Sequence, residues 1–317
     1  MSQSRKQKIR EDLQKQRRRR RTITTTAIAA IAMTAVIIII ILLQRPPPPT
    51  GLLDQPISQS LYDQLTGVSN STLTAAINAP GVTRLSSVTG TPLTSSSKPE
   101  VLYIGAEYCP FCAAERWSIG VALAKFGSFT GLTYMLSGDS PESFPDTATL
   151  SFRQSSYTSQ YVSFASVETN DRSPSHNSLQ SPTTEQQAVW DAYDPSRGIP
   201  FLDIGGSTGK QYLIGSSSPH SGAQFSPVLL SGLNWTEIGM QLNNPSSSAG
   251  QAIDGAADTI ISALCNLDGG APSNVCSNSY AQIVQAPFTT GQVPPADRQV
   301  RFQISEREVP ISWKNLS

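Results

Sequence analysis

The sequence is poor in the residues that bind metals, with only two histidines, His176 and His220, and four cysteines. Neither histidine stands at a spacing typical of zinc or copper ligands, and there is no second Cys-x-x-Cys motif. No nucleophilic triad or nucleic-acid-binding motif is present, and "GGSTGK" at 205–210 lacks the full spacing of a phosphate-binding loop. We therefore expect no metal, no cofactor and no nucleic acid as a partner.

Charged residues are absent from 22–43, a run of 22 residues that a helix would extend over about 33 Å, enough to cross a bilayer. The preceding segment, 1–21, holds ten Lys/Arg and two Asp/Glu, so its net charge is +8 and that of the remainder is −8. Basic residues before a transmembrane helix stay in the cytoplasm. The sequence predicts a cytoplasmic tail over 1–21, a single transmembrane helix over 22–43 and an extracytoplasmic remainder.

Two other interpretations of this N-terminal region are less favoured. A cleaved signal peptide has a shorter apolar region and a small-residue cleavage site, whereas "QRPPPP" follows here. Nucleic-acid binding by the arginine run at 17–21 is disfavoured because the run adjoins the apolar segment.

The remaining chain divides by composition into four parts. They are a proline-rich stalk with short helices (44–80), a main domain with an insertion at about 139–182 (81–245), a helical extension with the second cysteine pair (246–280) and a C-terminal tail (281–317). Consecutive prolines favour a stiff, extended spacer.

Apolar periodicity in the main domain alternates between the patterns of strands and of helices. The predicted strands are 101–106, 132–137, 147–154, 161–169, 199–206 and 210–215. The predicted helices are 113–129, 183–194, 234–242 and 250–265. The layout is that of an α/β domain with a mixed sheet.

All four cysteines fall on the predicted extracytoplasmic side, where an even number favours disulfides. The spacing suggests local pairs, Cys109 with Cys112 and Cys265 with Cys276, although four cysteines permit three connectivities. For the first pair, redox exchange is favoured over a static disulfide or a metal site. For the second, a structural disulfide is favoured over an electron relay to the first.

Cys109 precedes a predicted helix, whose first unpaired N–H groups favour a thiolate. Cys112, one turn later, is placed to resolve a mixed disulfide. Pro110 suits the first helical turn, and Phe111 offers an apolar surface to a substrate. Glu107 would oppose the thiolate if it lay close in space. Two charged residues further along the helix, at 115 and 116, are expected either to pair with each other at the surface or to shield the cysteines.

The stretch "GAEYCPFC" after a strand, with "GIPF" at 198–201 later, resembles a thioredoxin-like domain. More closely, "YIGAEYCPFCAAERW" and "IPFLDIGG" resemble the DUF929 family of membrane-anchored thioredoxin-like proteins, over roughly residues 80–280. The resemblance implies a three-layer sandwich, with Pro200 in a cis bond facing the cysteines and the Ile199 backbone pairing with substrate. It supplies no substrate, because the family is named for its unknown function.

The sequence departs from ordinary thioredoxins in two places. The residue six before the first cysteine, often an aspartate that accepts a proton, is Tyr103 here. Tyr103, Glu107 or water would have to take its place. Pro200 follows Cys112 by 88 residues, about twice the usual separation in a minimal thioredoxin, which predicts an inserted hairpin that covers part of the site.

The function expected from these features is that of a membrane-anchored extracytoplasmic thiol–disulfide oxidoreductase. Its partners would be thiols or disulfides of exported proteins and a membrane redox partner. The alternative is a non-enzymatic surface or binding protein that has a thioredoxin-like fold and a static disulfide.

Overall fold

A computed structural model describes residues 48–139, 141–214, 223–283 and 286–287. The described residues from Pro49 onward belong to one compact unit. In these ranges no helix is both long enough and apolar enough to cross a bilayer. The predicted basic tail at 1–21 and the predicted transmembrane helix at 22–43 lie outside the described residues and stay predictions.

The centre of the unit is a mixed sheet of seven strands. Strand β3 (Lys98–Gly105) pairs in antiparallel fashion with β9 (Phe201–Gly205) and in parallel with β8 (Ser163–Glu168). The other strands are β1 (Ser86–Thr89), β2 (Thr94–Ser95), β10 (Lys210–Ile214) and β11 (Ala286–Pro287). The order β11-β1-β10-β9-β3-β2, with β8 also beside β3, confirms a mixed α/β fold.

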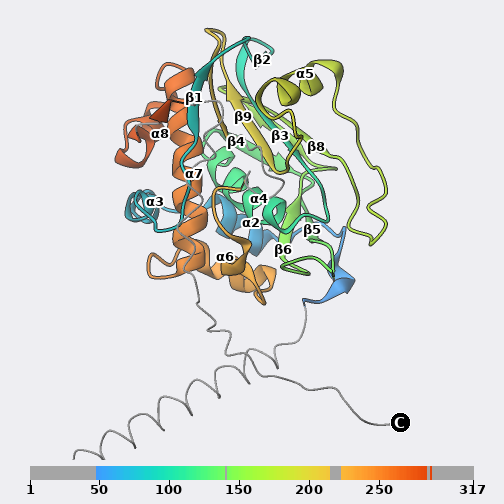
Figure 1. Ribbon diagram of the computed structural model, residues 1–317. Coiled ribbons are helices and arrows are strands. Elements are labelled where there is room, and N and C mark those ends of the chain that lie inside the picture. Colours follow the sequence, from blue (N-terminus) through green and yellow to red (C-terminus); the bar gives the residue numbers. More distant parts are fainter. Residues whose placement is uncertain (1–47, 140, 215–222, 284–285, 288–317) are drawn as a thin grey trace, which may run out of the picture. The chain divides into compact units, whose positions relative to one another are not determined.

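Helices cover both faces of this sheet. Helices α4 (Pro110–Leu123) and α7 (Ser248–Leu267) pack against each other on one face, and α5 (Thr184–Tyr193) lies against the other, as Figure 1 shows. A capping box joins Thr183 to Gln186 and fixes the start of α5, as its sequence predicts.

Strand β3 is buried on both sides because its side chains alternate between the two layers. Val101 and Tyr103 belong to the large core under α4 and α7, whereas Leu102 and Ile104 belong to the smaller core under α5. The continuous apolar run in the sequence therefore reflects a central strand with helices on both faces.

The predicted inserted hairpin is wrong in its pairing. Segments 147–154 and 161–169 do contain strands, but β6 (Ala148–Ser151) pairs with β5 (Thr133–Leu136), and β8 pairs with β3 in the central sheet. A further strand, β7 (Ser156–Ser159), pairs with β4 (Gly127–Thr130). Strand β8 pairs in parallel with β3 over Glu100–Gly105. In this register Val167, near the end of β8, is buried in the smaller core, which favours the pairing.

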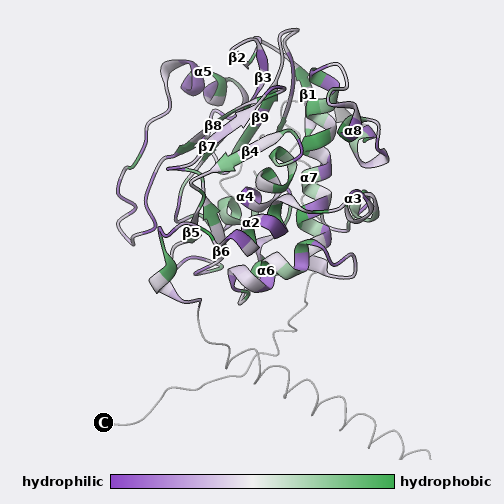
Figure 2. Cartoon of the chain, turned by 180° about the vertical axis from the view of Figure 1, so that it is seen from behind, coloured by the Kyte–Doolittle hydropathy of each residue, from purple (hydrophilic) through white to green (hydrophobic). Residues whose placement is uncertain are grey.

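The predicted stalk region contributes to the domain core. Helices α2 (Gln59–Thr66) and α3 (Asn70–Ala76) bury Leu65 and Leu73 against α4, α7 and α6 (Trp235–Leu242). The remaining short helices are η1 (Thr50–Leu52), η2 (Pro227–Leu230), α8 (Ser273–Cys276) and η3 (Ser279–Gln282). Figure 2 shows hydrophobic and hydrophilic stretches alternating along α7, which most of these elements contact.

Candidate active site around Cys109

Cys109 lies at the N-terminus of α4, facing the unpaired N–H groups of the first turn. It is the N-cap residue, and its Sγ accepts a hydrogen bond from the Cys112 N–H at 3.2 Å. Pro110 occupies the first helical turn, where its missing N–H has no helical partner to lose. Both cysteines are free thiols in the structure, and Cys109 stands where a helix N-terminus favours negative charge.

The two thiols have opposite pKa shifts. Burial acts to raise the pKa of Cys109, but hydrogen bonds from the Cys112 side chain and backbone and the charge of Arg116 outweigh it, so this pKa is lowered from its ordinary value of 9.0. Burial raises the pKa of Cys112 well above that value, and the hydrogen bond to Cys109 adds to the shift. Cys109 is therefore the more acidic thiol of the pair, and Cys112 keeps its proton to higher pH.

A cleft of about 430 Å³ opens beside Cys109. Its lining comes from the start of α4, the loops after β5 and β8, helix α5 and the segment before β9: Tyr108, Cys109, Pro110, Phe111, Glu142, Ser143, Thr169, Asn170, Trp190, Ser196, Arg197, Gly198 and Ile199. Cys109 is only 5% exposed, and Cys112 is fully buried. A partner can therefore reach the Cys109 sulfur only by entering this cleft.

The segment before β9 meets the cysteines although it lies 90 residues further along the chain. The Ile199–Pro200 bond is cis, as the thioredoxin-like resemblance implies. The Ile199 carbonyl oxygen lies 3.9 Å from Cys109 Sγ and accepts a hydrogen bond from it when the thiol is protonated. Antiparallel pairing of Ile104 with Phe201 sets this arrangement, because it brings the start of β9 to the end of β3.

Arg116 is a buried cation beneath the thiols, so of the two alternatives expected for residues 115 and 116 the surface pair is wrong. Its guanidinium binds both carboxylate oxygens of Glu168, at 2.7 and 2.8 Å, and donates to the Ala106 carbonyl at 2.9 Å. Arg116 and Glu115 are both fully buried. Arg116 follows Cys112 by four residues, which places both on one helix face. That spacing is the signal that could have identified it from the sequence.

Tyr103, one of the two predicted proton-transfer residues, is fully buried beside Cys112. A Cβ on Gly105 would meet the Tyr103 hydroxyl at 2.1 Å and Cys112 Sγ at 3.2 Å, so only glycine leaves room for both. Burial raises the pKa of Tyr103 well above 10.0. The hydroxyl thus stays protonated at neutral pH and is a poor proton acceptor.

Glu107, the other predicted proton-transfer residue, forms an ion pair with Arg153 at 2.9 Å. Burial raises its pKa from 4.5, and the charges of Arg153 and Arg116 lower it in part. Its side chain is 6% exposed. Of the two residues, Glu107 is the better proton acceptor near neutral pH.

An aromatic stack that the sequence did not reveal stands at the rim of the cleft. The Tyr108 ring lies parallel to the His176 imidazole, with centroids 3.7 Å apart. The His176 Nε2 is 3.7 Å from a Glu142 carboxylate oxygen. His176 has a positive φ of 47°, which few non-glycine residues adopt, in a loop whose Asn170 side chain binds its carbonyl. The loop thus holds the imidazole against the residue next to Cys109.

The second cysteine pair, Cys265 and Cys276, forms a disulfide, as its spacing predicts. It joins the end of α7 to the end of α8. The pair lies outside the set of residues that line the Cys109 cleft.

Residues 84–189 match the family model of DUF929, a domain of unknown function. The chain contains a DUF929 domain. The DUF929 match includes both cysteines of the CPFC motif, Arg116 and its partner Glu168, and it ends before Pro200. No curated protein and no solved structure matches the chain.

Proposed function

We propose that this protein is a thiol–disulfide oxidoreductase with a thioredoxin-like domain. The observation that carries the proposal is the position of Cys109: its Sγ caps a helix N-terminus, borders a cleft and lies 3.9 Å from the carbonyl that precedes a cis proline. Helix-capping thiols with a lowered pKa are the nucleophiles of disulfide exchange.

The order of elements supports a thioredoxin-like fold. Strand β3, helix α4, parallel strand β8, helix α5, antiparallel strands β9 and β10 and helix α7 follow one another along the chain. Their sheet order is β8-β3-β9-β10, with α4 and α7 on one face and α5 on the other. This arrangement is a three-layer sandwich in which the cysteines follow a central strand.

The proposed reaction exchanges two electrons in two steps. The Cys109 thiolate attacks a disulfide of the substrate, one substrate sulfur leaves as a thiolate, and a mixed disulfide forms. Cys112 then loses its proton and attacks Cys109 Sγ, which releases the second substrate thiolate and leaves a Cys109–Cys112 disulfide. The reverse sequence oxidises a substrate dithiol. The Ile199 backbone would hold the substrate chain, and Phe111 would pack against it.

The proposed setting is the outer side of a cell membrane, with the anchor at 22–43 and the basic tail at 1–21 in the cytoplasm. The substrates would then be exported proteins, and a membrane protein would reset the cysteines. The alternative is a non-enzymatic binding protein. The observation that favours it is that only 5% of Cys109 is exposed, because a buried sulfur is difficult for a substrate to reach.

The rate of thiol–disulfide exchange with a disulfide-bonded peptide distinguishes the oxidoreductase from the binding protein. In the full chain, we expect Cys109→Ser to abolish exchange and Cys112→Ser to accumulate a mixed disulfide at Cys109, which mass spectrometry of the intact protein detects. A Cys265→Ala/Cys276→Ala variant serves as the control and should retain exchange. Equal rates in the parent and in Cys109→Ser would refute the enzymatic proposal.

A further inference from the structure

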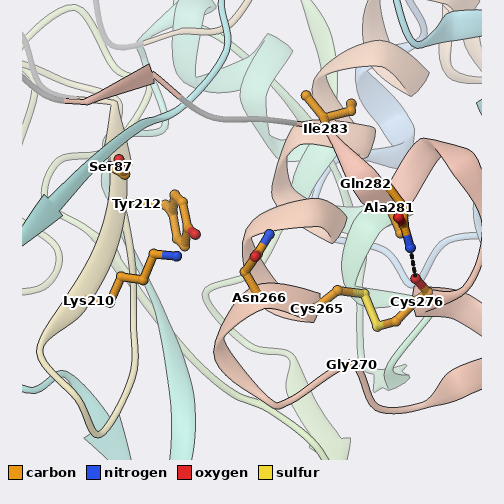
Figure 3. Close-up of a pocket in the computed structure, with 10 residues that line it drawn as sticks. All are labelled: Ser87, Lys210, Tyr212, Cys265, Asn266, Gly270, Cys276, Ala281, Gln282 and Ile283. Carbon is orange, nitrogen blue, oxygen red and sulfur yellow. Dashed lines mark hydrogen bonds between the residues drawn. A yellow bond between two sulfur atoms is a disulfide. The ribbon is translucent and has the colours of Figure 1, made fainter.

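A second pocket, of about 390 Å³, lies between the strands β1 and β10 and the C-terminal helices. Figure 3 shows Ser87, Lys210 and Tyr212 on the strand side, and the Cys265–Cys276 disulfide with Gln282 and Ile283 on the helix side. None of the residues that line the first pocket belongs to this one.

The disulfide forms part of the pocket wall and keeps a small accessible surface there. Cys265 is 7% exposed and Cys276 is 6% exposed, so a folded protein has little access to either sulfur. A molecule that fits the pocket meets them directly. Access of this kind decides which disulfides undergo exchange.

The loop between the two cysteines leaves space for the bond to open. Gly269 and Gly270 both have positive φ, and a Cβ at either would meet no atom within 4 Å. The α8 helix, which follows this loop, is a single turn of four residues. The loop between the cysteines is therefore free to move, whereas the cysteines themselves belong to the hydrophobic core.

The polar groups of the pocket favour an anionic ligand with hydrogen-bond donors. Lys210 is exposed, its Nζ lies 5.1 Å from the Tyr212 ring centroid, and no acidic residue belongs to the described lining. The side-chain N–H groups of Asn266 and Gln282 donate to the Ser262 and Cys276 carbonyls. Among the described residues, the amide oxygens of both side chains remain as acceptors.

We propose that this pocket binds a low-molecular-weight thiol that carries a carboxylate and an amide or amino group, and that this thiol reduces the Cys265–Cys276 disulfide. The carboxylate pairs with Lys210, and the amide or amino N–H groups donate to Asn266 and Gln282. The proposal is independent of the chemistry of Cys109.

The exchange balances with two molecules of thiol. The first thiolate attacks one sulfur of the disulfide, the S–S bond breaks, the other cysteine leaves as a thiolate and takes up a proton, and a mixed disulfide forms. The second thiolate attacks the ligand sulfur of that mixed disulfide. The products are two protein thiols and one oxidised ligand disulfide, so two electrons pass from the ligand to the protein.

The test uses the full chain with Cys109→Ala and Cys112→Ala, so that failure of the proposed function cannot affect it. Glutathione, whose carboxylates make it anionic, and neutral 2-mercaptoethanol serve as probes. Reduction of the disulfide is followed by alkylation and mass spectrometry. Lys210→Met is the test variant, and Arg84→Met, which removes an exposed cation outside the pocket, is its matched control.

We expect Lys210→Met to slow reduction by glutathione by about two- to fivefold, the range of one exposed ion pair, and to leave reduction by 2-mercaptoethanol unchanged. Arg84→Met should change neither rate. The proposal fails if glutathione does not reduce the disulfide, or if Lys210→Met slows both thiols equally or neither. Equal thermal unfolding midpoints of the two variants establish that any difference arises at the pocket.

Discussion

Arg116 shows how a single buried charge can set the chemistry of a thiol pair. Its guanidinium is neutralised by Glu168, yet it still lowers the pKa of Cys109, and it lies 5.9 Å from the Tyr103 ring centroid. A cation that stabilises a thiolate stabilises the reduced pair, which makes the disulfide form a stronger oxidant. Where ordinary thioredoxins bury a carboxylate under the cysteines, this protein buries an ion pair beside a tyrosine.

Replacing Arg116 by Met and Glu168 by Gln together tests this role without leaving a buried charge unpaired. We expect the pKa of Cys109 to rise, because the attraction of its thiolate to the cation is lost. The pH dependence of Cys109 alkylation, followed by peptide mass spectrometry, measures the shift.

The matched control is Arg172→Met with Asp146→Asn, a partly exposed ion pair that joins the loops after β5 and β8. It makes the same change in charge. An equal shift in both double variants would show that the Arg116 pair has no specific effect on Cys109.

At the scale of single elements, local patterns predicted most strands and helices but not how distant strands pair. The continuous apolar run at 101–106 indicates the buried strand β3, and the helix-forming residues with their apolar spacing in 113–129 indicate helix α4. The parallel pairing of β8 with β3 has no turn between the strands and leaves no local signal. The local pattern of the segment therefore favours a hairpin.

For the candidate site, too, the sequence predicts local motifs but not the contacts between distant segments. The cysteines and the Ile199–Pro200 segment carry recognisable motifs, whereas the partner of Arg116 is 52 residues away and a charged residue in a helix is normally solvated. The stack of Tyr108 on His176 likewise depends on a loop that the fold brings to the cleft.

The disulfide between α7 and α8 is expected to be a major stabilising link of the C-terminal elements. It closes a short loop, with a sequence separation of 11. We expect Cys265→Ala/Cys276→Ala to lower the free energy of unfolding by about 2–4 kcal/mol, because the unfolded chain gains conformational freedom. Denaturant unfolding monitored by tryptophan fluorescence measures the loss. Cys109→Ala/Cys112→Ala, which removes two free thiols, should cost less, and the opposite ranking would contradict the prediction.

For the molecule as a whole, buried carboxyl groups make stability depend on pH. Burial raises the pKa of Glu115, Asp203 and Asp254 to about 8 and that of Asp258 to about 9. Groups whose pKa is higher in the folded state stabilise it fully below their unfolded pKa, and this stabilisation is lost as pH rises through the folded pKa. The free energy of unfolding should therefore fall between about pH 5 and pH 9.

Asp258→Asn tests this dependence at the residue with the highest of these values. Asp258 is fully buried on α7, with both oxygens unpaired among the described residues. We expect the stability of Asp258→Asn relative to the parent to increase with pH, since the amide does not ionise. Urea unfolding at a series of pH values measures the difference. Asp63→Asn, on the exposed side of α2, is the control, and a parallel pH profile for Asp258→Asn and the parent would overturn the prediction.

The packing of α2 and α3 against α6 and α7 has a consequence for the order in which the chain can fold. Leu65 and Leu73, near the start of the unit, share a core with Trp235 and Ile260, near its end. During synthesis, the early helices and the β3–α4 motif emerge long before the residues that cover them. Contacts of such large sequence separation form slowly. The hydrophobic core that covers α4 is completed only after α7 has been synthesised, so a growing chain exposes the CPFC motif on an unfinished domain.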